Sequence, residues 1–269
     1  MRMYTATLAF FLSHALIDGR GILANDRYKA ADVQEGGSIR GIVRLTSGAR
    51  KAEAMAVSKD DRICGKSKPS PRLVVGKDGG VANTLVYIHG IVRGKKFGDV
   101  EKVTLNQTKC EYQPHIVLVP PDAEFEIVNS DKILHNVHAY DISADMKTIF
   151  NIAQPIAGQK TTVKARPKDG SGLALATCDA GHPWMSAFIV YMEHPYYTVT
   201  DASGSFVLKD VPPGTYTLKM WHEGVRVART ELEKGVVKKY YYEEPYEAEQ
   251  EVTVPPSGMA TVSYDLSLR

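Results

Sequence analysis

Short runs in which apolar and polar residues alternate dominate the chain from residue 30 onward. They are rich in Val, Ile, Tyr and Thr, which favour strands, and Gly, Pro, Asn or Asp residues separate most of them. No stretch after residue 30 keeps the 3.6-residue period of an amphipathic helix for long. This pattern predicts an all-β protein built of antiparallel sandwiches or barrels. The expected strands are 39–45, 72–75, 83–92, 115–119, 124–130, 161–165, 173–178, 188–192, 196–200, 205–210, 215–221 and 260–268.

The composition is that of a soluble globular protein. Hydrophobic residues make up 43% and charged residues 24% of the 269 positions, which argues against disorder. The formal net charge is +2, and no basic stretch resembles a nucleic-acid footprint. Nucleic acid is therefore not an expected partner.

Residues 1–24 have the features of a secretory signal peptide. Arg2 supplies a basic residue, and an apolar stretch follows from Met3 to Ile17. That stretch is too short and too polar for a transmembrane span, so none is expected in the mature chain. A buried helix of the mature fold is the alternative. Export would place the protein in the periplasm or outside the cell.

Three cysteines, Cys64, Cys110 and Cys178, form an odd set. In an exported chain the simplest arrangement is one disulfide and one cysteine kept for another task. Cys178 stands among His and Met residues, where a metal would hold it as a thiolate. Cys64 and Cys110 remain as the expected pair, although the sequence alone does not prove it.

The segment C-D-A-G-H-P-W-M, residues 178–185, combines three metal-binding side chains between two expected strands. A tight loop there can turn Cys178, His182 and Met185 toward one point. Soft sulfur ligands with imidazole favour copper, and a trigonal His₂Cys set with a weak axial Met is the blue-copper arrangement. A zinc site would not use the thioether. The segment therefore predicts a copper site that lacks one histidine.

The segment VNSDKILHNVHAYD, residues 128–141, offers the missing histidine. His135 follows an expected strand and precedes Asn136. Alternation along a regular strand puts His135 and His138 on opposite faces, so both cannot bind the same ion. His135 is the expected ligand, and a bulge in the strand would let His138 replace or join it.

These motifs resemble those of cupredoxins over about residues 108–192. In that family an upstream His-Asn pair supplies the first imidazole. The loop is similar to the amicyanin loop C-x-x-H-P-F-M, with one extra residue between Cys and His. Its spacing also matches half of the dinuclear copper loop of cytochrome oxidase, but Ala174 stands where that site needs a second Cys. The resemblance implies one copper ion held by His135, Cys178, His182 and Met185.

Four further residues are expected around the ligands rather than among them. The resemblance implies that Asn136 ties the two ligand loops together. Trp184 would shield the metal and so influence its potential, and His138 would be a neighbouring or surface imidazole. His115 could lie near the site, because the entry strand of cupredoxins passes beneath it. A packed core histidine is the alternative for His115.

A different pattern begins at residue 197. The stretch TVTDASGSFVLKDVPPGTYTL contains turn signals at D-A-S-G and P-G. It resembles the transthyretin-like domain called carboxypeptidase regulatory-like, which opens with a G-x-V strand, and Gly37–Leu45 looks like that strand. The resemblance implies a discontinuous sandwich of residues 37–58 and 197–269, with a copper domain, residues 62–195, inserted into it. Two sandwiches in tandem are the alternative.

A set of motifs runs through the complete chain: CGK at Cys64, DGGVANTLVYI, CEYQPH, HNVH, HPWM, the VTDASGSF turn and WHE. With these motifs the chain resembles a group of exported bacterial proteins. Their names include methylamine utilisation protein, plastocyanin-like protein and carboxypeptidase regulatory-like protein. The shared motifs include the residues around Cys64 and Cys110, so the resemblance also supports a structural disulfide between these two residues.

The combined expectation is a mononuclear copper protein that carries electrons in the periplasm or outside the cell. Electrons would enter and leave by the exposed imidazole edge of His182, and the partner would be a redox protein such as a cytochrome or a dehydrogenase. No substrate base, nucleophile or second metal cluster stands out, so an enzyme is not expected. A periplasmic copper chaperone or sensor, and a metal-free interaction module, are the alternatives.

The segment KKYYYEEPYEAEQE, residues 238–251, combines tyrosines and acids around one proline. It is expected to form an elongated, solvated hairpin of the second sandwich, with the tyrosines on one face. A docking surface for a redox partner is the alternative.

Overall fold

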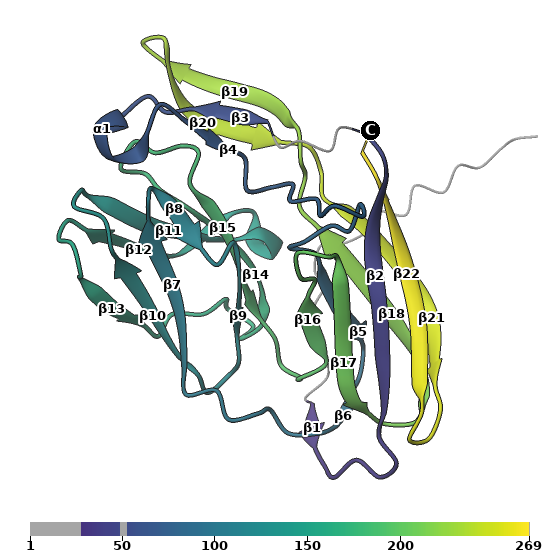
Figure 1. The fold of residues 1–269 in the computed structure, drawn as a ribbon. Helices are drawn as coiled ribbons and strands as arrows, with labels where there is room; N and C mark the ends of the chain where they lie inside the picture. Colours follow the sequence, from purple (N-terminus) through teal and green to yellow (C-terminus); the bar gives the residue numbers. More distant parts are fainter. Residues whose placement is uncertain (1–27, 49–52, 269) are drawn as a thin grey trace, which may run out of the picture.

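The computed structural model describes residues 28–48 and 53–268 of the chain. Strands make up nearly all of the regular structure, and helical turns in this part are limited to α1 (Asp61–Cys64) and the 3-10 turn η2 (Ile142–Ala144). The predicted all-β class is confirmed (Figure 1). The predicted signal peptide, residues 1–24, lies outside the described residues. Within those residues, no helix has the length and apolar character needed to cross a bilayer.

Two sheets pack face to face to form the first sandwich. One sheet has the order β13 (Lys160–Val163), β10 (Glu124–Asn129), β7 (Lys102–Thr108) and β8 (Glu111–Gln113). The other has the order β12 (Lys147–Gln154), β11 (His135–Asp141), β14 (Gly172–Thr177), β15 (Ser186–Tyr191) and β9 (Ile116–Val119). Apolar side chains from both sheets fill the space between them, among them Leu105, Phe125, Ile127, Val137 and Ile189.

Two further sheets form the second sandwich, which Figure 1 places beside the first. One sheet has the order β16 (Tyr197–Val199), β5 (Leu85–His89), β18 (Gly214–His222) and β21 (Tyr246–Val254). The other has the order β17 (Ser205–Val211), β2 (Gly37–Ser47) and β22 (Met259–Ser267). Its core contains Ile39, Val43, Leu218 and Leu266.

Strands β15 and β5 join the two sandwiches, because successive side chains of each strand pack on opposite faces. In β15, Ile189 points into the first sandwich while its neighbours Phe188 and Val190 belong to a separate cluster. In β5, Tyr87 joins that same cluster, which also contains Trp221 of β18. Successive side chains of a strand point to opposite faces, so each of these strands packs on two sides. A sheet of each sandwich therefore faces a sheet of the other across an apolar layer.

The predicted domain boundaries need two corrections. Residues 85–89, assigned to the copper domain, form β5 and pair with β16 and β18 of the second sandwich. Residues 54–56, assigned to the second sandwich, form β3 (Ala54–Ala56), which pairs with β4 (Ser67–Pro69), and Met55 is buried in the core of the first sandwich. The sequence did not fix the sheet of either strand, because both are short apolar runs that fit either core.

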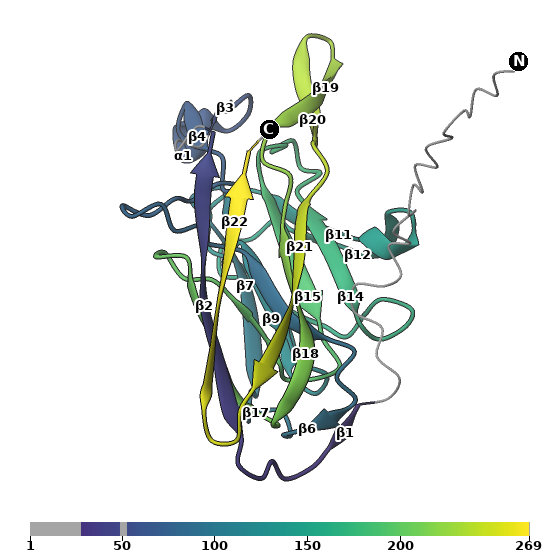
Figure 2. The ribbon, with the colours of Figure 1, turned by 90° about the vertical axis from the view of Figure 1, so that its right-hand side faces the viewer.

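Two small β-structures flank the sandwiches at the same end of the molecule (Figures 1 and 2). The first, called the cap below, is the segment 53–69 with β3, α1 and β4. The second, called the hairpin below, consists of β19 (Val227–Glu233) and β20 (Val236–Tyr242), which pair with each other alone among the described strands. A third short pair joins β1 (Lys29–Ala30) to β6 (Arg93–Gly94).

The prediction of one hairpin over residues 238–251 is wrong. Its first part belongs to β20 and pairs with β19, whereas its last part belongs to β21 and pairs with β18. Pro245 lies between the two strands.

The predicted strand 72–75 is also absent from the described region as a strand, since only Val75 makes an isolated bridge there, to Val81. The polar strand β7, KVTLNQT, was not predicted because its apolar residues are too few.

Candidate metal centre

Three metal-binding side chains lie together at one end of the first sandwich. They are His135 at the start of β11, Cys178 directly after β14, and His182 in the loop before β15. The Nδ1 atoms of the two histidines are 3.1 Å apart. The Sγ atom of Cys178 lies 3.5 Å from Nδ1 of His182 and 4.0 Å from Nδ1 of His135. All three side chains are buried.

Strand pairing explains why these residues meet. β14 and β15 are antiparallel neighbours whose last pair is Thr177 with Ser186, so residues 178–185 form the loop that closes this pair. β11 is the other neighbour of β14 and pairs His138 with Thr177. The chain before His138 therefore runs past the same loop, which brings His135 to it. Asn136 fixes this approach, because its side-chain oxygen accepts the backbone N–H of Asp179 at 2.7 Å.

The donor atoms fit a single metal ion. Nitrogen and thiolate ligands bind about 2.0 to 2.3 Å from an ion such as zinc, so two ligands of one ion lie about 3 to 4 Å apart. The three distances fall in this range. Burial lowers the pKa of both imidazoles, although their carboxylate neighbours oppose that shift. Both rings are thereby kept in the neutral form that binds metals.

The sulfur of Cys178 has polar neighbours in spite of its burial. Burial raises the pKa of this thiol, and hydrogen bonds from the backbone of Asn136 and Ala180 act in the opposite direction. Donors aimed at the sulfur stabilise a thiolate and tune a metal bound to it. Among the described residues, Cys178 is the free cysteine.

A carboxylate holds the outer nitrogen of each imidazole. Asp131 Oδ2 lies 2.9 Å from Nε2 of His135, and Asp60 Oδ2 lies 2.9 Å from Nε2 of His182. A partner on the outer nitrogen fixes the tautomer and turns the other nitrogen inward, as is usual for metal-binding histidines. Neither carboxylate was predicted from the sequence. The spacing of four residues between Asp131 and His135 was a signal for one of them, but Asp60 is remote in sequence.

The cap covers His182, which overturns the expectation of an exposed imidazole edge. The ring of His182 is 0% exposed, because Asp60 contacts its outer nitrogen and Lys59 Nζ donates to the carbonyl of Ala180 at 2.6 Å. A disulfide between Cys64 and Cys110 ties the cap to the sandwich, and the predicted pairing is present. The expectation failed because Lys59 and Asp60 fall between the two predicted domains, 37–58 and 62–195, and are more than 100 residues from His182 in the sequence.

Met185 and Trp184 complete the buried surroundings. Both belong to the same core cluster as Cys178, and each is 2% exposed. The backbone N–H of Met185 donates to the carbonyl of His182 at 3.0 Å, which closes the loop tightly. Trp184 packs beside His182 with ring centroids 5.2 Å apart, and its indole N–H donates to the carbonyl of Cys110. The indole thus joins the loop to the disulfide.

The other histidines considered as neighbours lie outside the donor group. His138 points away from the core, where its ring nitrogens contact Asp179 at 2.6 Å and Thr148 at 2.7 Å. His115 is buried where the two sandwiches meet and contacts Glu223 and the carbonyl of Ser186. Asp131 and His135 also lie near Cys110, but that cysteine is in the disulfide and has no thiolate to offer.

Comparisons with known proteins give partial likenesses. No curated protein matches the chain. A family model described as polysaccharide lyase family 4, domain II, matches residues 170–239, which run from the approach to β14 into β20. The chain is similar to the novel purple cupredoxin from Nitrosopumilus maritimus, with 18% identity and a TM-score of 0.27 over 34% of this chain and 97% of that one.

It is also similar to the copper-containing nitrite reductase of Thermus scotoductus SA-01. The identity is 20% and the TM-score 0.27, over 36% of this chain and 23% of that chain. None of these findings supports the methylamine utilisation name, and the family match has a description other than the carboxypeptidase regulatory-like domain. Two facing sheets with the donor group at one end make the first sandwich cupredoxin-like.

Proposed function

We propose that this protein binds one copper ion through His135, Cys178, His182 and Met185 and carries single electrons. The observation that supports this most is the buried donor group, whose two nitrogens and one sulfur lie within 4.8 Å of one another. A thiolate and two imidazoles, with a thioether in the same loop, favour copper and suit both of its oxidation states. The proposal includes no catalytic step, because the protein would exchange electrons with a redox partner and transform no substrate.

The proposal also places the protein outside the cytoplasm, in the periplasm or beyond the cell. The disulfide between Cys64 and Cys110 supports this location, because such bonds persist in oxidising compartments and are rare where thiols are kept reduced. Cell fractionation with thiol labelling under denaturing conditions tests it. One free thiol in the exported fraction is the expected result, and three free thiols in a cytoplasmic fraction would contradict this location.

The copper site is tested by a visible spectrum after addition of stoichiometric Cu(II). The expected result is an intense thiolate-to-copper absorption that is lost in the Cys178→Ser variant. His135→Ala and His138→Ala form a matched pair, because the two histidines lie on the same strand and only the first lies in the donor group. Loss of the band in the first variant and its retention in the second would support the assignment. Equal copper content in the parent and in Cys178→Ser would refute the site.

A second candidate is a copper chaperone or sensor with the same ligands. The coverage of His182 by the cap favours it, because a fully buried imidazole offers no edge at which a partner could exchange electrons. Protein-film voltammetry separates the two functions. A reversible one-electron wave supports electron transfer, whereas tight Cu(I) binding without a reversible wave supports copper handling.

A further inference from the structure

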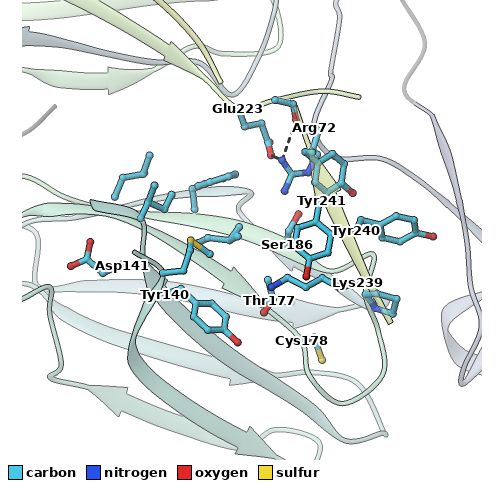
Figure 3. Close-up of a pocket in the computed structure, with 18 of the residues that line it drawn as sticks. Arg72, Tyr140, Asp141, Thr177, Cys178, Ser186, Glu223, Lys239, Tyr240 and Tyr241 are labelled. Carbon is cyan, nitrogen blue, oxygen red and sulfur yellow. Dashed lines mark hydrogen bonds and ion pairs between the residues drawn. The ribbon is translucent and has the colours of Figure 1, made fainter. Parts of the chain in front are cut away.

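A cleft of about 1580 Å³ lies beside the candidate metal centre. Residues of β11, β14 and β15 form its floor, and the hairpin forms its roof. Figure 3 shows Tyr140, Thr177 and Cys178 on the floor, with the side chain of Tyr241 pointing toward Thr177. Small-molecule sites usually measure about 300–1,000 Å³. This cleft is large enough to receive part of another macromolecule.

The cleft passes over the chain segment that carries Cys178, whose own side chain is buried in the core of the first sandwich. Cys178 and Pro183 line it, whereas the cap closes the route to His182. Thr177 precedes Cys178 and pairs across the strands with His138. The ring of His138 stacks on Tyr140, with ring centroids 3.9 Å apart. A partner in the cleft would therefore contact the segment that carries the sulfur ligand, although the imidazole ligands are buried.

The lining of the cleft has an excess of negative charge. Nine carboxylate side chains line it, against five lysine and arginine side chains. The chain as a whole has a formal charge of +2, so this local excess has the opposite sign. The buried ion pair of Glu223 and Arg72, drawn at one end of Figure 3, leaves the excess unchanged. A concave surface of one charge attracts ligands of the other charge and raises their rate of association.

The tyrosines of the cleft already bind cations from the protein itself. Lys239 Nζ lies 5.1 Å from the ring of Tyr241 and 5.9 Å from the ring of Tyr140, between roof and floor. On the same roof, Arg229 stacks over Tyr241 at 3.7 Å. Such contacts are attractive because a cation meets the negative face of the ring. The roof and the floor therefore combine carboxylates with tyrosine rings that attract positive groups.

We propose that this cleft is the docking surface for a redox partner and that it accepts a basic surface of that partner protein. The inference rests on the proposed electron-transfer function and adds the location and the charge of the partner. It replaces the imidazole edge of His182, which the cap covers, by the backbone segment of Thr177 and Cys178 as the place of electron exchange.

The first test uses metal-free protein, so its outcome does not depend on copper. Hexaamminechromium(III), a redox-inert paramagnetic cation, is added in small amounts while amide signals are recorded by NMR. Broadening concentrated at Tyr140, Thr177 and the hairpin, and absent with the hexacyanochromate(III) anion, is the expected result. Uniform broadening, or broadening elsewhere on the surface, would overturn the docking surface.

The second test measures electron transfer from the reduced copper protein to tris(phenanthroline)cobalt(III), one electron converting each Co(III) to Co(II). Glu233→Lys combined with Asp169→Lys reverses two exposed charges of the cleft. We expect the rate to fall about tenfold at low salt, and the rate with anionic hexacyanoferrate(III) not to fall. Lys239→Gln should act in the opposite direction and speed the reaction with the cation.

Glu251→Lys combined with Asp265→Lys is the matched control, because it makes the same change in net charge on β21 and β22, outside the cleft. Equal effects of the two double variants would overturn the proposal. A protein that takes up no copper but still binds the chromium cation in the cleft would refute electron transfer and leave the cation-binding surface in place. Copper uptake without chromium binding in the cleft would refute only the docking surface.

Discussion

The two candidate imidazole ligands are held by carboxylates of different origin. Asp131 stands four residues before His135 and is itself fixed by the backbone N–H groups of Lys109, at 2.8 Å, and Cys110, at 2.7 Å. Asp60 is 122 residues away from His182 and has a side chain that is 32% exposed. The orientation of His135 is therefore fixed by residues of the first sandwich itself. The coverage of His182 depends instead on a separate segment that must stay in place.

Removal of the disulfide, which should affect the cap over His182 and leave the surroundings of His135 in place, gives the largest expected effect. Cys64 and Cys110 are 46 residues apart, and a closed loop of this length stabilises the folded state by about 4 kcal/mol in the chain-entropy treatment. Cys64→Ser combined with Cys110→Ser should therefore lower the free energy of unfolding by about this amount, measured by urea denaturation. The cap should also become mobile in this variant and expose His182.

Chelator competition tests the second part of that prediction. Copper should leave the double serine variant faster than the parent at the same temperature, because the cap no longer shields His182. The reduced parent is the matched sample, since it lacks the bond but keeps both cysteines. A cap that stays closed in both samples, judged by unchanged copper release, would show that Asp60 and Lys59 hold it without the disulfide.

A buried ion pair lies near the end of the loop of residues 178–185. Glu223, directly after β18, contacts Arg72, with Oε2 and Nη1 2.6 Å apart. Glu223 also contacts His115, which in turn reaches the carbonyl of Ser186 next to Met185. Glu223→Gln leaves Arg72 buried without its counter-charge. The expected loss in the free energy of unfolding is about 3 kcal/mol, because breaking a buried pair strands the other charge.

The same residue predicts a dependence on pH. Burial raises the pKa of Glu223, but His115 and Arg72 outweigh this and hold the pKa below its usual value. A depressed pKa contributes stability above the pH at which a free glutamate protonates, about 4.3, and this contribution disappears as the pH falls through the folded-state pKa. Urea midpoints between pH 6 and pH 3 should fall more steeply for the parent than for Glu223→Gln.

The two carboxylates themselves give a smaller and more selective effect. Asp131→Ala should lower the free energy of unfolding by about 2 kcal/mol, because two buried backbone donors lose a charged acceptor. Asp60→Ala should have a much smaller effect on stability, since its contacts are partly exposed. Both variants should weaken copper binding by about 10–100-fold, because each frees the outer nitrogen of a proposed ligand. Equal stability of the two variants would contradict the distinction between them.

The sequence predicted the loop that carries Cys178 and His182 better than it predicted the cap and the carboxylates around them. Cys178 and His182 occupy a single loop between two strands, so their spacing predicted that their side chains would meet, whereas Met185 as a ligand stays a prediction. The approach of His135 was predicted as well, since its neighbour Asn136 marks the approach of β11 to the loop. These residues are set by strand register, which a period-2 pattern encodes directly.

The contact of the cap with His182 could not be predicted from the sequence in the same way. The strands of the cap are three residues each, its helix is a single turn, and it folds onto His182 from a segment more than 100 positions earlier. No local pattern records such a contact. Residues 83–92 pose a related problem, because a strand that is apolar on both faces fits the core of either sandwich. The pairing of β5 with β18 was therefore visible only in the fold.

The smallest expected effect lies in the second sandwich and tests its independence from the site. The carboxylate of Asp201 accepts the backbone N–H groups of Ser203, at 2.8 Å, and Ser205, at 3.0 Å, in the turn before β17. These hydrogen bonds lie at the surface, so Asp201→Ala should lower the free energy of unfolding by only about 1 kcal/mol. Copper affinity should not change, because the turn contacts neither the cap nor the donor loop. A parallel loss of copper binding would show that the second sandwich shapes the metal centre through the apolar layer between the sheets.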